Sequence, residues 1–239
     1  MKSLKLFLLL GVFLSSLDDE LRAQQSTNTN QRLDKRHEAV VTISAFTAKG
    51  DLTRLKKALI EGLDAGLTVN EIKEVLVQLY AYAGFPRSLN ALHKFMEVIK
   101  ERKAKGIDDK TGKEATPFSK TINKQQFGTE MQTKLVGSPV KGEVYEFAPA
   151  IDQFLKEHLF GDIFGRDNLD WKTRELATIS ALAVLGGVES QLRAHFNVGM
   201  HNGLTGEQLV QLISIIRDNV GEKEASDAEK VLREVLKSK

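Results

Sequence analysis

Apolar residues recur at helical spacing along most of the chain from residue 34 onward. Val40, Ile43 and Phe46 mark one such stripe, because residues three or four apart lie on the same face of an α-helix. The polar–apolar alternation that is typical of a β-strand is found in no segment, so the pattern predicts an all-α fold. The helices expected in the most regular parts of the pattern are residues 69–83, 87–103, 206–218 and 223–236.

The pattern also occurs twice. Residues 42–45 (Thr-Ile-Ser-Ala) recur 136 positions later as residues 178–181, and residues 66–68 (Gly-Leu-Thr) recur 137 positions later as residues 203–205. One inserted residue reconciles the two offsets. This self-similarity is typical of a duplicated helical unit, and since neither short unit can bury its apolar faces alone, we expect the two copies to pack as a pseudo-two-fold pair.

Both copies carry the same signal for the start of a helix. Thr68 is followed three residues later by Glu71, and Thr205 is followed three residues later by Gln208. In this capping box the Thr side chain accepts a hydrogen bond from the backbone N–H of the residue three positions later. The Glu or Gln side chain of that residue accepts one from the backbone N–H of the Thr. Asp170 is the predicted N-cap of a further helix.

The N-terminus predicts export. Lys2 and Lys5 precede an apolar run at residues 6–14, which is too short to span a bilayer and has the shape of a secretory signal. The alternative is a buried or loosely attached N-terminal helix. We predict a periplasmic or secreted protein that consists of a signal peptide (1–23), a first unit (33–103), a linker and connecting helix (104–164) and a second unit (165–239).

Composition narrows the classes of function. A hydrophobic content of 41% and a charged content of 28% are ordinary for a globular protein. The formal charge is only +2 and basic residues alternate with acidic ones, so we expect neither nucleic acid nor, for the mature form, a membrane as a partner. The chain has no cysteine, which excludes disulfides, thiolate nucleophiles and cysteine metal sites.

Particular segments resemble a known family. Residues 169–176, 191–195 and 202–205 resemble the first part of a carboxymuconolactone decarboxylase domain, and residues 78–86 resemble its second part. The wider superfamily is similar to the alkylhydroperoxidase-D-like proteins, which implies a duplicated helical bundle and a homo-oligomer. The peroxidase branch of that superfamily carries a Cys-x-x-Cys pair where this chain has Val188 and Gln191, so cysteine-dependent peroxidase chemistry is excluded.

The resemblance implies a lyase that decarboxylates a small carboxylated lactone without a cofactor. Such a reaction needs cations that bind the substrate carboxylates, a hydrogen-bond donor that stabilises the enolate, and an acid that protonates the carbon atom from which CO₂ has left. His195 is the acid–base candidate, and Glu175, which faces inward on its predicted helix, would orient or charge it. Tyr82 would donate to the enolate, and Arg193 and Arg87 would bind the substrate carboxylates.

Structural interpretations of the same residues stay open. His195 and Tyr82 could be packed core residues, and Glu175 could pair with Arg174 or Arg193. Arg87 and Arg193 could both be solvated surface charges. The alternative function is therefore a non-catalytic helical oligomer that binds a small ligand, and a third is acid–base catalysis on another small carbonyl compound.

One further pair has the spacing of metal ligands. His158 and Asp162 lie four residues apart, but the turn at Gly161 argues against a site there, so we expect no metal.

Overall fold

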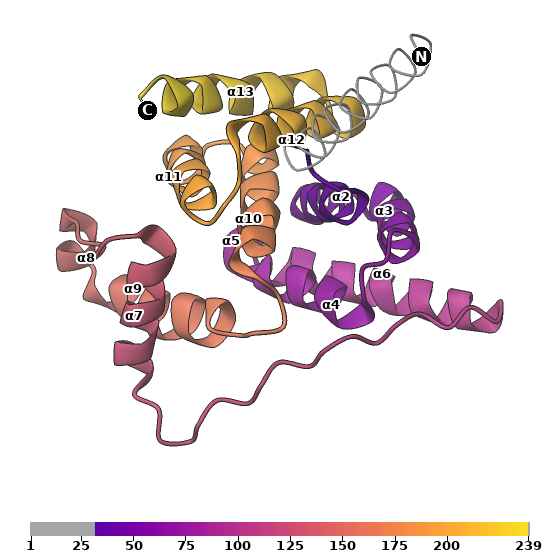
Figure 1. Ribbon diagram of the computed structural model, residues 1–239, viewed down its shortest axis with the longest axis horizontal. Helices are drawn as coiled ribbons and strands as arrows, with labels where there is room; N and C mark the ends of the chain where they lie inside the picture. Colours follow the sequence, from indigo (N-terminus) through magenta and orange to yellow (C-terminus); the bar gives the residue numbers. More distant parts are fainter. Residues whose placement is uncertain (1–31, 239) are drawn as a thin grey trace, which may run out of the picture.

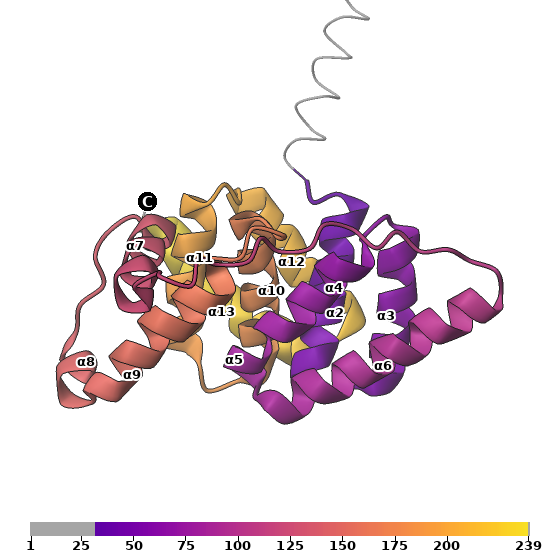
Figure 2. The same cartoon turned by 90° about the horizontal axis from the view of Figure 1, so that it is seen from below.

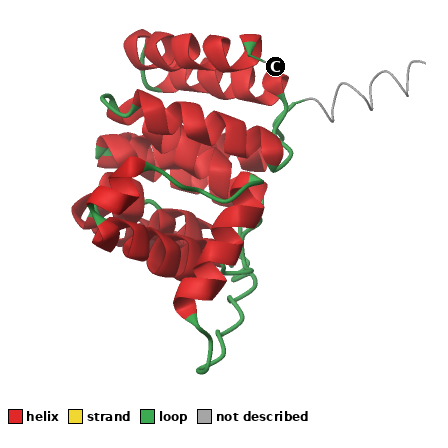
Figure 3. Cartoon of the chain, turned by 90° about the vertical axis from the view of Figure 1, so that its left-hand side faces the viewer, coloured by secondary structure: helices red, strands yellow, loops and turns green. Residues whose placement is uncertain are grey.

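The computed structural model describes residues 32–238, and the predicted signal peptide lies outside this range. The described residues form helices joined by loops, with no strand among them, which confirms the all-α prediction (Figure 3). Within the described part of the chain no helix has the length and apolar character needed to cross a membrane.

The helices fall into three groups along the chain. The first comprises α2 (Lys35–Lys49), α3 (Leu52–Asp64), α4 (Val69–Gln78), α5 (Tyr80–Ala83) and α6 (Phe85–Ala104). The connecting group comprises α7 (Lys124–Val136), α8 (Glu143–Phe147), α9 (Pro149–Gln153) and the π-helix η1 (Phe154–Phe164). The last comprises α10 (Trp171–Leu185), α11 (Glu189–His201), α12 (Gly206–Asn219) and α13 (Glu222–Lys237). We call the first and last groups the first and second units.

Helices α10 to α13 repeat α2, α3, α4 and α6, and the N-caps of the first and third helices recur. Thr68 and Thr205 both form complete capping boxes, at the starts of α4 and α12. Asp170 caps α10 by accepting from the backbone N–H of Thr173 (2.9 Å), as Asp34 does for α2. The caps at Thr68, Thr205 and Asp170 are the start signals that the sequence predicts.

The first helices of the two units, α2 and α10, pack against each other at the centre of a hydrophobic core that both units share. Figure 1 shows α12 and α13 on one side of this pair and α4 and α6 on the other. His37 of α2 lies 136 positions before Thr173 of α10, and their side chains meet (Nε2 to Oγ1, 3.5 Å). Equivalent residues in contact mark the pseudo-two-fold axis.

Each unit also holds the first helix of the other. Glu74 of α4 pairs with Arg174 of α10 (2.8 Å). The equivalent positions are Gln211 of α12, 137 residues after Glu74, and Glu38 of α2, 136 residues before Arg174. There the side-chain amide of Gln211 donates to Glu38 (2.8 Å). The two units are therefore joined by equivalent contacts on the two sides of the axis, in addition to their shared core.

The connecting segment differs most from the sequence-based expectation. Residues 105–123 run as a loop from the end of α6 across the molecule to α7 (Figures 1 and 2). The sequence pattern does not predict the helix α7. α7 packs tightly on η1 at Gly128. A Cβ at this position would lie 1.7 Å from the carbonyl oxygen of Lys156 in η1, so the packing leaves no room for a side chain. The predicted helix 69–83 is divided at Leu79 into α4 and α5.

Candidate active site

Glu175 and His195 meet between the first two helices of the second unit. Glu175 lies in the second turn of α10 with its side chain fully buried, and His195 lies midway along α11 with 17% of its side chain exposed. The Nδ1 atom of His195 is 2.8 Å from Oε2 of Glu175. A buried carboxylate on Nδ1 makes that nitrogen the donor, so Nε2 is the ring atom left for chemistry.

Tyr82 reaches the same place from the first unit. Its ring meets that of His195 edge-on, with 5.6 Å between the centroids. Burial raises the pKa of the Tyr82 phenol, and the negative charge of Glu175 adds to this rise. The phenol therefore stays protonated at neutral pH and can act only as a neutral donor or acceptor.

Two polar atoms of this cluster are buried without a hydrogen-bond partner among the described residues: Oε1 of Glu175 and the hydroxyl of Tyr82. An unpaired buried polar atom costs about 1–3 kcal/mol, so native proteins contain few of them. A catalytic role is one of the reasons for which proteins keep such atoms, and the Tyr82 hydroxyl also has the Thr178 side chain as a neighbour.

A second layer of polar residues fixes α10 behind the cluster. The side-chain amide of Gln78 donates to Thr178 Oγ1 and to the backbone carbonyl of Arg174 (both 2.9 Å), and its oxygen accepts from the Arg174 guanidinium (3.0 Å). Burial would raise the pKa of Glu74, but hydrogen bonds from Arg166 and Arg174 hold it below its ordinary value. No sequence pattern indicated this layer, although Glu74 and Gln78 lie four residues apart on the buried face of α4.

The α7–η1 hairpin covers one side of the cluster. Leu135, Phe160 and Phe164 of the hairpin pack with Val198 of α11 in a small apolar core, which Tyr82 also contacts. Trp171 at the start of α10 donates from Nε1 to the Phe164 carbonyl (3.0 Å). The connecting segment therefore shapes the site, a role that its sequence did not indicate.

The two arginines expected to bind substrate carboxylates lie elsewhere. Arg193 pairs with Glu234 of α13 and is 44% exposed. Arg87 is exposed and lies beside Gly50, where its Nε would be 4.0 Å from an added Cβ. Neither forms a hydrogen bond or ion pair with the three clustered residues.

The His158–Asp162 pair is engaged within the protein. His158 Nδ1 lies 2.9 Å from Asp162, whose other oxygen pairs with Lys124 at 2.9 Å. The described residues contain no group of three or more His, Cys, Asp or Glu side chains placed to hold a metal ion.

Sequence comparisons place these features in a family. The chain matches the model of the carboxymuconolactone decarboxylase family over residues 19–95 and 149–234, more than half of its length. It is 31% identical to the 4-carboxymuconolactone decarboxylase of Acinetobacter baylyi over 90 residues, which are 36% of this chain and 66% of that protein, slightly under two thirds. It is 27% identical to an uncharacterized protein of Methanocaldococcus jannaschii over 75 residues, 31% of this chain and 70% of that protein. The chain belongs to the carboxymuconolactone decarboxylase family.

Proposed function

We propose that this protein is a cofactor-free lyase that decarboxylates a small carboxylated lactone, with His195 as its acid–base residue. The observation that carries the proposal is the hydrogen bond between the buried Glu175 carboxylate and His195, whose ring is 17% exposed. A histidine held in one orientation by a buried acid presents a single defined nitrogen to a substrate. The similarity to a 4-carboxymuconolactone decarboxylase names the substrate class.

The reaction assigns one role to each clustered residue. The bond between the carboxylate carbon and the lactone breaks, CO₂ leaves, and the electron pair passes into the lactone carbonyl as an enolate. Tyr82, which stays protonated, donates a hydrogen bond to the enolate oxygen. The imidazolium form of His195, held by the hydrogen bond from Nδ1–H to Glu175, then protonates carbon from Nε2–H and becomes the neutral Nδ1–H tautomer. A proton from solvent restores the imidazolium, so that one proton is taken up for each CO₂ released.

The test is turnover of 4-carboxymuconolactone by the purified protein and by His195→Gln. We expect histidine-dependent release of CO₂, with the helical fold unchanged by circular dichroism. His93→Gln is a matched control, because His93 lies on the exposed surface of α6, and it should keep full activity. Turnover that survives in His195→Gln would refute the assignment.

A second candidate function is a non-catalytic helical oligomer that binds a small ligand. The position of the arginines favours it, because among the described residues Arg193 and Arg87 form no hydrogen bond or ion pair with the cluster and would leave substrate carboxylates without these two cations. In that case the folded protein turns over no lactone, and ligand binding tolerates His195→Gln. Histidine-dependent turnover of a different small carbonyl compound would instead support acid–base catalysis by His195 on another substrate.

We also propose export and self-association. The signal-like residues 1–23 support a periplasmic or secreted location, and the family resemblance supports a homo-oligomer. N-terminal sequencing of the protein recovered from each cell fraction tests the first proposal. Light scattering on the purified protein tests the second.

A further inference from the structure

The turn between the first two helices is one residue longer in the second unit than in the first. Gly50 and Asp51 join α2 to α3, whereas Gly186, Gly187 and Val188 join α10 to α11. This is where the offset between the copies changes from 136 to 137. Gly186 and Gly187 have φ values of 70° and 73°, a conformation that glycine adopts without strain.

The longer turn leaves the end of α10 open. In the first unit Gly50 N–H donates to Thr47 O (3.1 Å) and Asp51 N–H to Phe46 O (3.0 Å), which closes the end of α2. The turn after α10 makes no equivalent bond, so in the described structure the last carbonyls of α10 have no backbone N–H partner. Such carbonyls form the negative end of the helix dipole.

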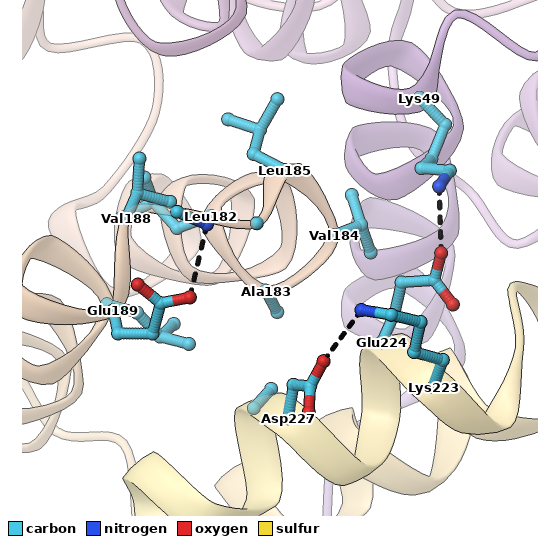
Figure 4. Close-up of a pocket in the computed structure, with 14 residues that line it drawn as sticks. Lys49, Leu182, Ala183, Val184, Leu185, Val188, Glu189, Lys223, Glu224 and Asp227 are labelled. Atoms are coloured by element: carbon cyan, nitrogen blue, oxygen red, sulfur yellow. Dashed lines mark hydrogen bonds and ion pairs between the residues drawn. The ribbon is translucent and has the colours of Figure 1, made fainter.

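A hollow of about 350 Å³ lies against this open end, and we call it the α10–α11 hollow (Figure 4). All four residues of the last turn of α10, residues 182–185, line it. The carbonyls of a last helical turn point along the axis towards the C-terminal end of the helix, which is the end at which this hollow lies. Buried apolar side chains, including those of Leu182, Leu192 and Ala228, also line it. Its size is near the lower end of the range for small-molecule sites.

The rim of the hollow is negatively charged. Three carboxylates line it against two lysines: Lys49 is held by Glu224 (2.8 Å) and Lys223 by Asp227 (2.9 Å). The hydrogen bond with Asp227 raises the pKa of Lys223, and the charges of Glu224 and Glu189 add to this. Glu189, on the opposite side of the hollow in Figure 4, is the carboxylate with no lysine partner in the described structure.

We propose that the α10–α11 hollow binds a small primary ammonium ion that carries a short apolar chain. The ammonium group would donate to the unpaired carbonyls of α10 and to Glu189, while the chain would lie over Leu182 and Leu192. Glu189 is already oriented for this, because its Oε1 accepts from Gly187 N–H (3.1 Å). The site is separate from His195, so it does not depend on the proposed lyase activity.

The test is a ¹H–¹⁵N NMR titration of the purified protein with n-pentylammonium, and with pentanoate as the probe of opposite charge. We expect saturable shifts of the Gly186 and Gly187 amides with the ammonium and none with pentanoate. Glu189→Gln keeps the acceptor for Gly187 and removes only the charge, so it should weaken binding about fivefold. Glu222→Gln, a matched change at a carboxylate that pairs with Arg217 outside the hollow, should not.

Two further variants complete the design. Deletion of Gly187 restores the two-residue turn of the first unit and should abolish the ammonium response, and His195→Gln should leave that response unchanged. Absence of saturable shifts at the two glycines, an equal response to pentanoate, or undiminished affinity in Glu189→Gln would each overturn the proposal. The Glu189→Gln result decides the matter even if the deletion variant fails to fold.

Discussion

The two units share four corresponding helices and the N-caps of two of them, yet only one of the two equivalent positions carries the cluster of candidate catalytic groups. By the offsets of the duplication, His195 corresponds to Ala58, Glu175 to Ala39 and Tyr82 to Asn219. Around the first-unit position the structure has a hollow of about 330 Å³ whose lining includes Ala39 and Asn219. The helical bundle therefore does not need the candidate catalytic residues in order to form, because the first unit has the same helices with Ala58 and Ala39 in place of His195 and Glu175.

The surroundings of the two positions differ as well. Thr178 has a counterpart in Thr42, but Gln78, which fixes Thr178 and α10, corresponds to Ile215. The α7–η1 hairpin packs only on the second-unit position in the described structure. The polar second layer and the apolar cover therefore accompany the histidine, as expected for a site whose geometry must be held.

The largest effect on turnover is expected from breaking the hydrogen bond between Glu175 and His195, which has no counterpart in the first unit. Glu175→Gln removes the buried charge that orients His195, and turnover of 4-carboxymuconolactone should fall about 100-fold or more. The double variant with His195→Gln should lose little beyond the single one, because the two residues act as a unit. Glu61→Gln, at the first-unit hollow, is the control. Unchanged turnover in Glu175→Gln would show that His195 does not need the buried carboxylate for its proposed role.

The next effect compares the two contacts across the pseudo-two-fold axis. Arg174→Met leaves the buried Glu74 carboxylate short of a partner and should lower the free energy of unfolding by about 3–5 kcal/mol. Glu38→Met, at the equivalent position of α2, removes a partly exposed contact and should cost less than about 1 kcal/mol. Urea unfolding monitored by circular dichroism measures both. Equal losses would show that the two contacts are energetically equivalent.

Sequence pattern predicted those parts of the fold that local interactions determine. The capping boxes at Thr68 and Thr205 and the N-cap at Asp170 form as expected. α7 was missed because its sequence includes Gly128 and has no clear apolar stripe, so its stability comes from close packing on η1, which no local pattern encodes. Local signals therefore located the units, and tertiary packing decided the connecting segment.

The candidate site shows the same division. The helical stripe correctly predicted that Glu175 is buried, but its partner could have been Arg174, Arg193 or His195. The structure decides this, because Arg174 pairs with Glu74, 100 residues away in sequence, and Arg193 pairs with Glu234. Choices between long-range partners depend on how helices cross, which spacing along one helix cannot specify. Turnover measurements remain the test of the role of each residue.

A smaller effect tests whether the units are equivalent where they look alike. Thr68→Ala and Thr205→Ala each remove the side chain that caps a helix, and each should cost about 1 kcal/mol of unfolding free energy. The double variant should lose the sum, since distant sites are usually additive within about 0.5 kcal/mol. Thr→Ser at either position keeps the hydroxyl and should restore most of the loss. A clearly larger loss at one position would mean that one unit contributes more to stability.

The smallest effect is a shift in acid stability that depends on the buried layer behind the site. The pKa of Glu74 is lowered in the folded protein, so its ionised form stabilises the fold above its ordinary pKa of 4.5, and this contribution disappears as the pH falls through the folded value. Arg166→Gln removes a hydrogen bond to the carboxylate and should move the acid limb of the stability curve to higher pH. Arg36→Gln, which removes a partly exposed ion pair with Glu71, should leave that limb in place. Unfolding free energies measured between pH 3 and 7 distinguish the two variants, and coincident acid limbs would show that Glu74 is not the group that couples folding to protons.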